Sequence, residues 1–168
     1  MDNDLAHVTT TEPAQREQKV TLKRMLCFQL SNASYCIELG YIKEVIKPQN
    51  LTRVPCMPVF IKGVMNLRGE IITIFDIGHF IGSTAEPLRK HSRVIVTDVV
   101  SHKVGFIADR VLGKININSN TIQPPLSILD KNTIRCITGQ IEEGNEIYLV
   151  LNIYNILTNS DITNLTNN

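Results

Sequence analysis

One arginine stands out among the residues that could do chemistry, because its neighbours would hold it in place. Arg68 lies in the short polar break Asn66-Leu67-Arg68-Gly69-Glu70, which has an apolar run on each side. Gly69 can take a positive φ without the penalty of a Cβ atom, so the break is typical of a tight turn. A guanidinium is a planar fork of donors that matches a carboxylate. The pattern therefore predicts a fixed arginine suited to binding a carboxylate.

The other reactive side chains form no recognisable catalytic or metal-binding pattern. No two cysteines form a C-x-x-C pair, no histidine lies at ligand spacing from any of them, and neither a G-x-S-x-G elbow nor a glycine-rich phosphate loop occurs. The sequence therefore predicts no enzyme, no metal site and no cofactor. The four cysteines are Cys27, Cys36, Cys56 and Cys136. We interpret them as structural free thiols in a reducing compartment, and we expect all but Cys56 to be buried in apolar segments.

Composition narrows the class of partner. The chain has 168 residues, 43% of them hydrophobic, and its 17 basic and 16 acidic residues leave a net charge of +1. Nucleic acids and anionic membranes attract a field of one sign, so neither is expected to be the main partner. No apolar run approaches the roughly 20 residues that span a bilayer, and the N-terminus does not resemble a secretory signal. We therefore expect a cytoplasmic protein without membrane insertion.

The elements that must position Arg68 are the two arms of a hairpin. Residues 63–67 form a short apolar arm, and residues 71–77 are dense in β-branched side chains, which favours a largely buried strand. Just before them, Pro58 and Gly63 stand where a proline begins and a glycine ends a helix. The sequence therefore predicts one helical turn over 58–63 that leads into the hairpin.

Short strands with turn signals run along the rest of the chain. Strands are expected at residues 24–30, 35–39, 42–46, 93–99, 104–111, 114–117, 134–141 and 146–151, with turns at 101–103 and 142–145, a helical turn near 77–81, and a helix over 153–157 capped by Asn152. About ten short strands and no long helix indicate an all-β barrel or sandwich. Residues 1–21 and 159–168 lack apolar periodicity and are predicted to be a flexible arm and a disordered tail around one domain at 22–158.

Several of these segments together resemble the CheW family, the adaptors that couple bacterial chemoreceptors to the histidine kinase CheA. The matching segments are FIKGVMNLRGEIITIFDI at 60–77, FQL and YCI at 28–30 and 35–37, IKEVI at 42–46, VGFIADRV at 104–111 and EIYLVLNI at 146–153. Asn-Leu-Arg-Gly alone would be a weak match, but between these flanks it is specific. Departures are mild: Thr73 stands where the family often has proline, and Ala108 where it has valine.

The resemblance implies a fold of two five-stranded SH3-like β-barrels packed together, with short helical turns and a short C-terminal helix. It implies an adaptor, monomeric when free, that binds the cytoplasmic tip of a chemoreceptor with one surface and the regulatory domain of CheA with another. It also implies recruitment to membrane-associated receptor arrays. Carried over by position, the residues that belong to or support the receptor-facing region are Ile42, Glu44, Gly63, Asn66, Leu67, Arg68 and Gly69, with Glu44 the natural partner of Arg68.

Two alternatives stay open at this stage. The same scaffold could serve a different receptor–kinase pathway, such as surface motility, and only the identity of the partner separates the two. A small hydrolase or a nucleic-acid-binding barrel is the other alternative. It would need a nucleophile–base pair or a basic face, and the sequence offers neither.

Removal of residues 1–19 and 161–168 tests the interpretation of the two ends. Because segments without apolar periodicity bury little surface, we expect the free energy of unfolding to change by less than about 1 kcal/mol. Chemical denaturation of the truncated and full-length chains measures the difference. A larger loss would show that one of the two ends docks on the domain.

Overall fold

The computed structural model of the protein describes residues 21–83, 87–99, 102–125 and 131–158. Ten strands, two short α-helices and three 3-10 turns lie in these ranges. The strands are β1 (Leu22–Leu30), β2 (Ala33–Glu38), β3 (Ile42–Ile46), β4 (Ile61–Leu67), β5 (Glu70–Phe75), β6 (Arg93–Val99), β7 (His102–Ala108), β8 (Arg110–Asn118), β9 (Ile137–Glu143) and β10 (Glu146–Leu151). The helices are α1 (Lys131–Cys136) and α2 (Ile153–Leu157), and the 3-10 turns are η1 (Leu39–Tyr41), η2 (Ile77–Phe80) and η3 (Ser119–Thr121).

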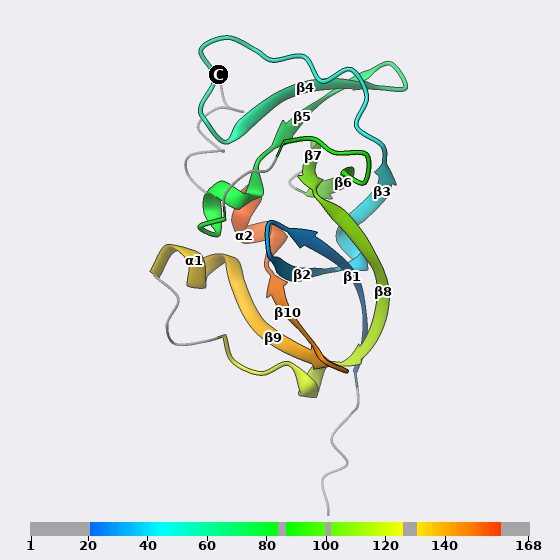
Figure 1. Ribbon diagram of the computed structural model, residues 1–168, viewed down its shortest axis with the longest axis vertical. Helices are drawn as coiled ribbons and strands as arrows, with labels where there is room; N and C mark the ends of the chain where they lie inside the picture. The colour runs from blue at the N-terminus through cyan, green and yellow to red at the C-terminus, as the bar shows by residue number, and fades with distance from the viewer. Residues whose placement is uncertain (1–20, 84–86, 100–101, 126–130, 159–168) are drawn as a thin grey trace, which may run out of the picture.

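The strands form two five-stranded sheets, each curled into a small SH3-like barrel (Figure 1). The first barrel has the strand order β8-β1-β2-β10-β9, and the second has the order β3-β6-β7-β5-β4. The middle of the chain therefore builds the second barrel, and both of its ends contribute to the first. One neighbouring pair in each barrel is parallel, β10 with β2 and β5 with β7. Tight turns cannot join parallel strands, so each pair brings together distant parts of the chain.

Strand β1 is buried on both of its faces over residues 25–28. Leu26 and Phe28 point into a large cluster between the barrels, whereas Met25 and Cys27 point into the core of the first barrel. Successive side chains of a strand leave on opposite faces, so a strand between two cores must be apolar at consecutive positions. The run Met25-Leu26-Cys27-Phe28 meets this requirement.

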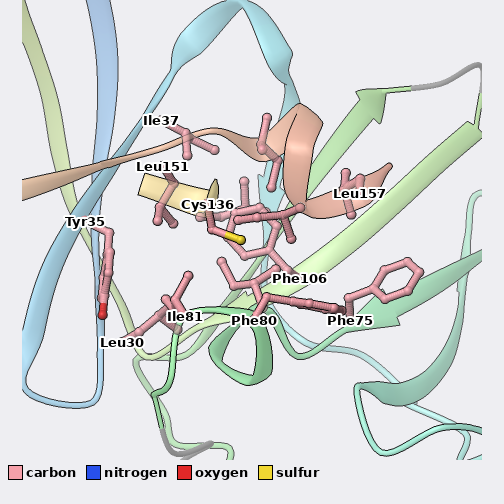
Figure 2. Packing of buried hydrophobic residues seen from close by; sticks show 14 of the residues in the cluster. Leu30, Tyr35, Ile37, Phe75, Phe80, Ile81, Phe106, Cys136, Leu151 and Leu157 are labelled. Atoms are coloured by element: carbon pink, nitrogen blue, oxygen red, sulfur yellow. The ribbon is translucent and has the colours of Figure 1, made fainter. Parts of the chain in front are cut away.

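The cluster between the barrels joins them into one unit. It collects buried side chains from β1, β2, β5, β6 and β7, from η2, and from both helices, and Figure 2 shows fourteen of them converging around Phe106 and Cys136. Helix α2 inserts Ile153, Ile156 and Leu157 into it, and the side chain of Asn152 caps this helix at the backbone N–H of Asn155, 3.0 Å away. Each barrel also has a smaller core of its own.

The fold expected from the resemblance is confirmed: two SH3-like barrels pack together, and the helices are short. The predicted hairpins β1–β2, β4–β5 and β9–β10 are also present, as are strand β6, the turn at 77–81 and the C-terminal helix. The expectations for residues 1–20 and 159–168 lie outside the described residues.

The predicted helical turn over 58–63 is wrong. A hydrogen-bonded turn joins the Ile61 N–H to the Pro58 carbonyl at 2.9 Å, and Lys62 and Gly63 already belong to strand β4. Gly63 is needed for a different reason from ending a helix. Its φ is +146°, it lies at an irregularity in the β4–β5 register, and the backbone of Thr52 pairs beside it with Val64.

Three other predicted boundaries are wrong. Residues Ile134–Cys136 were expected in a strand but form the end of helix α1, and β9 begins only at Ile137. The expected strand over 104–111 is two strands, because the chain bends at Asp109, whose carboxylate accepts a hydrogen bond from the Ser31 N–H at 2.6 Å. Strand β7 begins at His102, a position expected to lie in a turn.

Replacing Gly63 by alanine tests the close approach of Thr52. A Cβ atom at Gly63 would lie 2.3 Å from the Thr52 carbonyl oxygen, whereas one at Gly113, whose φ of +141° is similar, would meet nothing within 4 Å. Both Gly63→Ala and Gly113→Ala carry a backbone cost of about 1–3 kcal/mol. We expect Gly63→Ala to lose about 1–3 kcal/mol more through the overlap. Equal losses in denaturant unfolding would show that the contact does not matter.

Candidate protein-binding site

The β4–β5 turn holds Arg68 in an uncommon backbone conformation. Leu67 pairs with Glu70, so the loop has only two residues, and both have positive φ, 53° for Arg68 and 90° for Gly69. Such signs are those of a type I′ turn, which favours Asn-Gly. The side-chain oxygen of Asn66 accepts a hydrogen bond from the Gly69 N–H at 2.8 Å and so closes the turn.

Arg68 makes a two-pronged ion pair with Glu44 on strand β3. Nη1 lies 3.2 Å from one carboxylate oxygen and Nη2 lies 2.8 Å from the other. The Arg68 side chain is 78% exposed and that of Glu44 24%. Strands β3 and β4 are the two edges of the second sheet, so the ion pair links the hairpin tip to the opposite edge. The carboxylate partner expected for the arginine is thus present within the chain.

Two further ion pairs lie close to this one. Lys103 contacts Glu70, and Lys43 lies 3.2 Å from Asp98. The hydrogen bond and charge of Glu70 raise the pKa of Lys103, and the carboxylates of Asp98 and Glu44 add to this shift. Three cations and three carboxylates therefore share one surface of the second barrel, which is locally neutral. We call these six residues the ion-pair cluster: Lys43, Glu44, Arg68, Glu70, Asp98 and Lys103.

The backbone of Arg68 is difficult to explain by stability alone. A side chain larger than glycine at positive φ costs about 1–2 kcal/mol, and an exposed ion pair returns only about 0–1 kcal/mol. Asparagine at this position would tolerate the conformation better. Strained positions of this kind concentrate at functional sites, where the position of the side chain matters more than its cost.

A groove of about 450 Å³ lies beside the ion-pair cluster, between strand β3 of the second barrel and strand β8 of the first. It is lined mainly by aliphatic side chains, and Lys43 and Glu44 stand on the β3 side while Lys114 stands on the β8 side. Its lining residues are Leu26, Leu39, Ile42, Lys43, Glu44, Val45, Val111, Gly113 and Lys114. Strands β3 and β8 are both edges of their sheets. An apolar groove with a charged rim is suited to the apolar face of a partner helix.

The residues predicted for the site divide into three groups. Ile42 and Glu44 line the groove, and Arg68 reaches Glu44 from the hairpin tip. Asn66 and Gly69 build the turn that holds Arg68. Leu67 and Gly63 have supporting positions, because Leu67 packs against the core of the second barrel and Gly63 lies at the β4 irregularity.

Reasoning from the sequence missed the half of the groove that comes from the first barrel. Leu26 and Val111 belong to strands β1 and β8, and Lys114 follows on β8. Their alternating pattern predicts strands but does not indicate which other strand they face. Val45 could have been found, because its neighbours Glu44 and Ile46 were already assigned to an extended segment.

The described residues contain no group of three or more histidine, cysteine, aspartate or glutamate side chains that could hold a metal ion. None of the four cysteines, all of which the structure describes, is in a disulfide. Cys27, Cys36 and Cys136 are buried, and Cys56 is exposed.

No helix among the described residues is long and apolar enough to cross a membrane. An apolar groove between two barrels, bordered by a charge cluster, is typical of a surface that binds another protein.

Comparison with known proteins identifies the family. Residues 24–161 match the model of the CheW-like domain, and the chain belongs to this family. It is similar to the chemotaxis protein CheW of Treponema pallidum, with 27% identity over 148 residues that cover 86% of this chain and 87% of that protein. It is also similar to the protein PilI of Pseudomonas aeruginosa, with 32% identity over 117 residues that cover 68% of this chain and 65% of PilI.

A solved structure supports the same assignment. The crystal structure of the scaffolding protein TtCheW from Thermoanaerobacter tengcongensis superposes with a TM-score of 0.75 and 25% sequence identity, covering 89% of this chain and 96% of that one. The chain is therefore a scaffold or adaptor of the chemotaxis type, as the resemblance of its hairpin segment implied.

Substitutions at the turn separate the role of the Arg68 side chain from the free-energy cost of its positive φ. Arg68→Ala and Arg68→Asn both remove an exposed ion pair, so we expect each to change the free energy of unfolding by no more than about 0.5–1 kcal/mol. Arg68→Asn should be the more stable of the two, because asparagine tolerates positive φ.

Gly69→Val is the matched control for these variants. A Cβ atom at Gly69 would meet nothing within 4 Å, so its cost comes from the backbone alone. We expect a loss of more than about 1–2 kcal/mol, because a β-branched residue resists positive φ. If thermal unfolding showed Arg68→Asn to be as damaging as Gly69→Val, Arg68 would be a structural residue.

Proposed function

We propose that this protein couples chemoreceptors to the histidine kinase CheA. One surface would bind the cytoplasmic tip of the receptor, and another would bind the regulatory domain of the kinase. The proposal is supported by membership of the CheW-like family and by the similarity to proteins named for chemotaxis and scaffolding. The single observation that carries it is the position of Glu44, which both lines the groove and holds Arg68.

The receptor would place one helix of its tip in the groove between the barrels. Its apolar face would cover Ile42, Val45 and Val111, which are partly exposed side chains of the groove lining. Hydrophobic burial would supply most of the affinity, at about 25 cal/mol per Å² of apolar surface. Arg68 and Glu44 would fix the orientation of the helix, because their donors and acceptors are already held in place.

The role of the protein would be placement, and it would carry out no reaction. It would hold receptor and kinase in one array, so that the conformation of the receptor biases the activity of the kinase. Small interfaces of modest affinity gain strength when several of them act together, because each binding event raises the effective concentration for the next. The free protein would be a monomer in the cytoplasm, and the receptors would recruit it to the membrane.

A second receptor–kinase pathway is the alternative, and the similarity to PilI favours it specifically. In that case the same groove would take the tip of a different receptor, for example in surface motility. Affinity purification of the protein from its own cells, followed by identification of the bound kinase and receptor, distinguishes the two pathways.

Introduction of a charge into the groove lining tests the receptor-binding surface. Val45 lies on the groove and is 38% exposed, so Val45→Asp should not disturb the core. We expect it to weaken co-sedimentation with receptor-containing membranes at least about tenfold, because a buried charge without a partner would then face the apolar helix. The measurement is made without and with CheA.

Ile147→Asp is the matched control for Val45→Asp. Ile147 is a β-branched strand residue of the first barrel, 52% exposed, outside the groove lining. Ile147→Asp should leave binding to receptor membranes without CheA unchanged.

Arg68→Ala should weaken the free energy of binding to the receptor by about 2–5 kcal/mol, the usual cost of losing a charge-assisted contact at an interface. Normal receptor-stimulated kinase activity in both Val45→Asp and Arg68→Ala would overturn the assigned surface.

A further inference from the structure

Two buried thiols face each other in the core of the first barrel. Cys27 of β1 is the register partner of Cys36 of β2, and their residues are 1% and 0% exposed. Both belong to the same core cluster, which also includes Met25 and Val150. The site described above does not use either thiol, and the proposed function does not require them.

The register places this pair at a position that suits a disulfide. The β1–β2 turn has two residues, and Leu30 pairs with Ala33 across it. Residues that flank a two-residue turn form a hydrogen-bonded pair, and such pairs alternate with non-hydrogen-bonded ones along the ladder. Three steps along, Cys27 and Cys36 form a non-hydrogen-bonded pair. The Cα atoms of such a pair lie about 4.5 Å apart, and disulfides span roughly 4.4–6.8 Å.

We propose that Cys27 and Cys36 are an oxidisable dithiol, which a small peroxide converts to a cross-strand disulfide in the folded protein. In the first step the sulfur of Cys27 attacks one peroxide oxygen, the O–O bond breaks, and a sulfenic acid and one water form. In the second step the sulfur of Cys36 attacks the sulfenic sulfur, the S–S bond forms, and the oxygen leaves as a second water. Two thiols and one hydrogen peroxide thus give one disulfide and two waters.

The two thiols differ in a way that supports this order. The pKa of Cys27 is lowered, chiefly by its side-chain interaction with Cys36 and against the opposing effect of burial. The same interaction, together with burial, raises the pKa of Cys36. Cys27 is therefore the better nucleophile, because the thiolate is the reactive form.

A small pocket borders the core that contains the two thiols, and it is lined by their core neighbours rather than by the thiols themselves. It has a volume of about 160 Å³ and is lined by Met25 and Val150, among other residues. Met25 is two residues from Cys27 on the same face of β1, and Val150 pairs with Cys36 between β10 and β2. The Lys23–Glu38 ion pair, 3.0 Å long, belongs to the same lining. Hydrogen peroxide is little larger than a water molecule, so it fits a space of this volume.

The other two cysteines cannot take part in the same reaction. Cys136 packs in the cluster between the barrels, and Cys56 is exposed in the connection between β3 and β4. Substitution of Cys56 by serine removes the thiol that could link two molecules, and substitution of Cys136 by serine serves as a matched control for a buried thiol.

The test treats the folded Cys56→Ser protein with hydrogen peroxide and follows it by intact-mass and peptide mass spectrometry. We expect a loss of two hydrogen atoms per chain, a peptide that links Cys27 to Cys36, reversal by a dithiol reductant, and a higher midpoint of thermal unfolding because the cross-link restricts the unfolded chain. Cys136→Ser should behave in the same way. Cys36→Ser should form no link and should gain one oxygen on the peptide that carries Cys27, a sulfenic acid that dimedone traps once the oxidised protein is unfolded.

Three results would overturn the proposal. The first is that both thiols stay reduced while the protein remains folded. The second is that oxygen adds to either sulfur without formation of a link. The third is that the link forms only at denaturant concentrations that unfold the barrel. Mapping of the Cys56→Ser protein distinguishes all three, so the test does not depend on the folding of Cys36→Ser.

Discussion

The rest of the structure depends on the packing of the two barrels against each other, and the contact between Phe28 and Phe106 lies within this packing. The two rings come from different barrels, are fully buried, and lie 5.5 Å apart at an interplanar angle of 52°. They are members of the cluster that fills the space between the barrels. Burying a side chain of this size stabilises a fold by about 1.5–3 kcal/mol. The cluster thus fixes the distance between β3 and β8, and with it the width of the groove, which neither barrel could form alone.

The ion-pair cluster holds its side chains in place more than it stabilises the fold. Its six charges are largely on the surface, where each pair contributes about 0–1 kcal/mol and salt weakens it further. The pairing of Arg68 with Glu44 nevertheless holds the guanidinium in one place beside the groove. A partner that bound there would meet a side chain that is already ordered, so less conformational entropy would be lost on binding. This is a physical reason for keeping an arginine in a turn that would favour asparagine.

Scaffolds act through the relative positions of their surfaces, and the topology of this chain suits such a role. Both ends of the chain complete the first barrel, while the middle forms the second, so the two barrels are linked by chain crossings as well as by the shared cluster. The strand that carries Leu26 on the groove side carries Cys27 on the other. The groove and the dithiol therefore share strand β1, although they face different cores.

The sequence by itself determined the local features: the hairpin turn with Arg68 and Gly69, most strands, the cap at Asn152, and, through the resemblance, the family and the fold. These follow from short-range patterns of apolar side chains, turn residues and family motifs. Only the tertiary structure decided that Thr52 lies against Gly63, that residues 134–136 are helical, and that β8 faces β3 across a groove. The same is true of the register that sets Cys27 opposite Cys36. Such contacts join residues that are distant in the chain, and strand periodicity of two residues carries no information about which strands will meet.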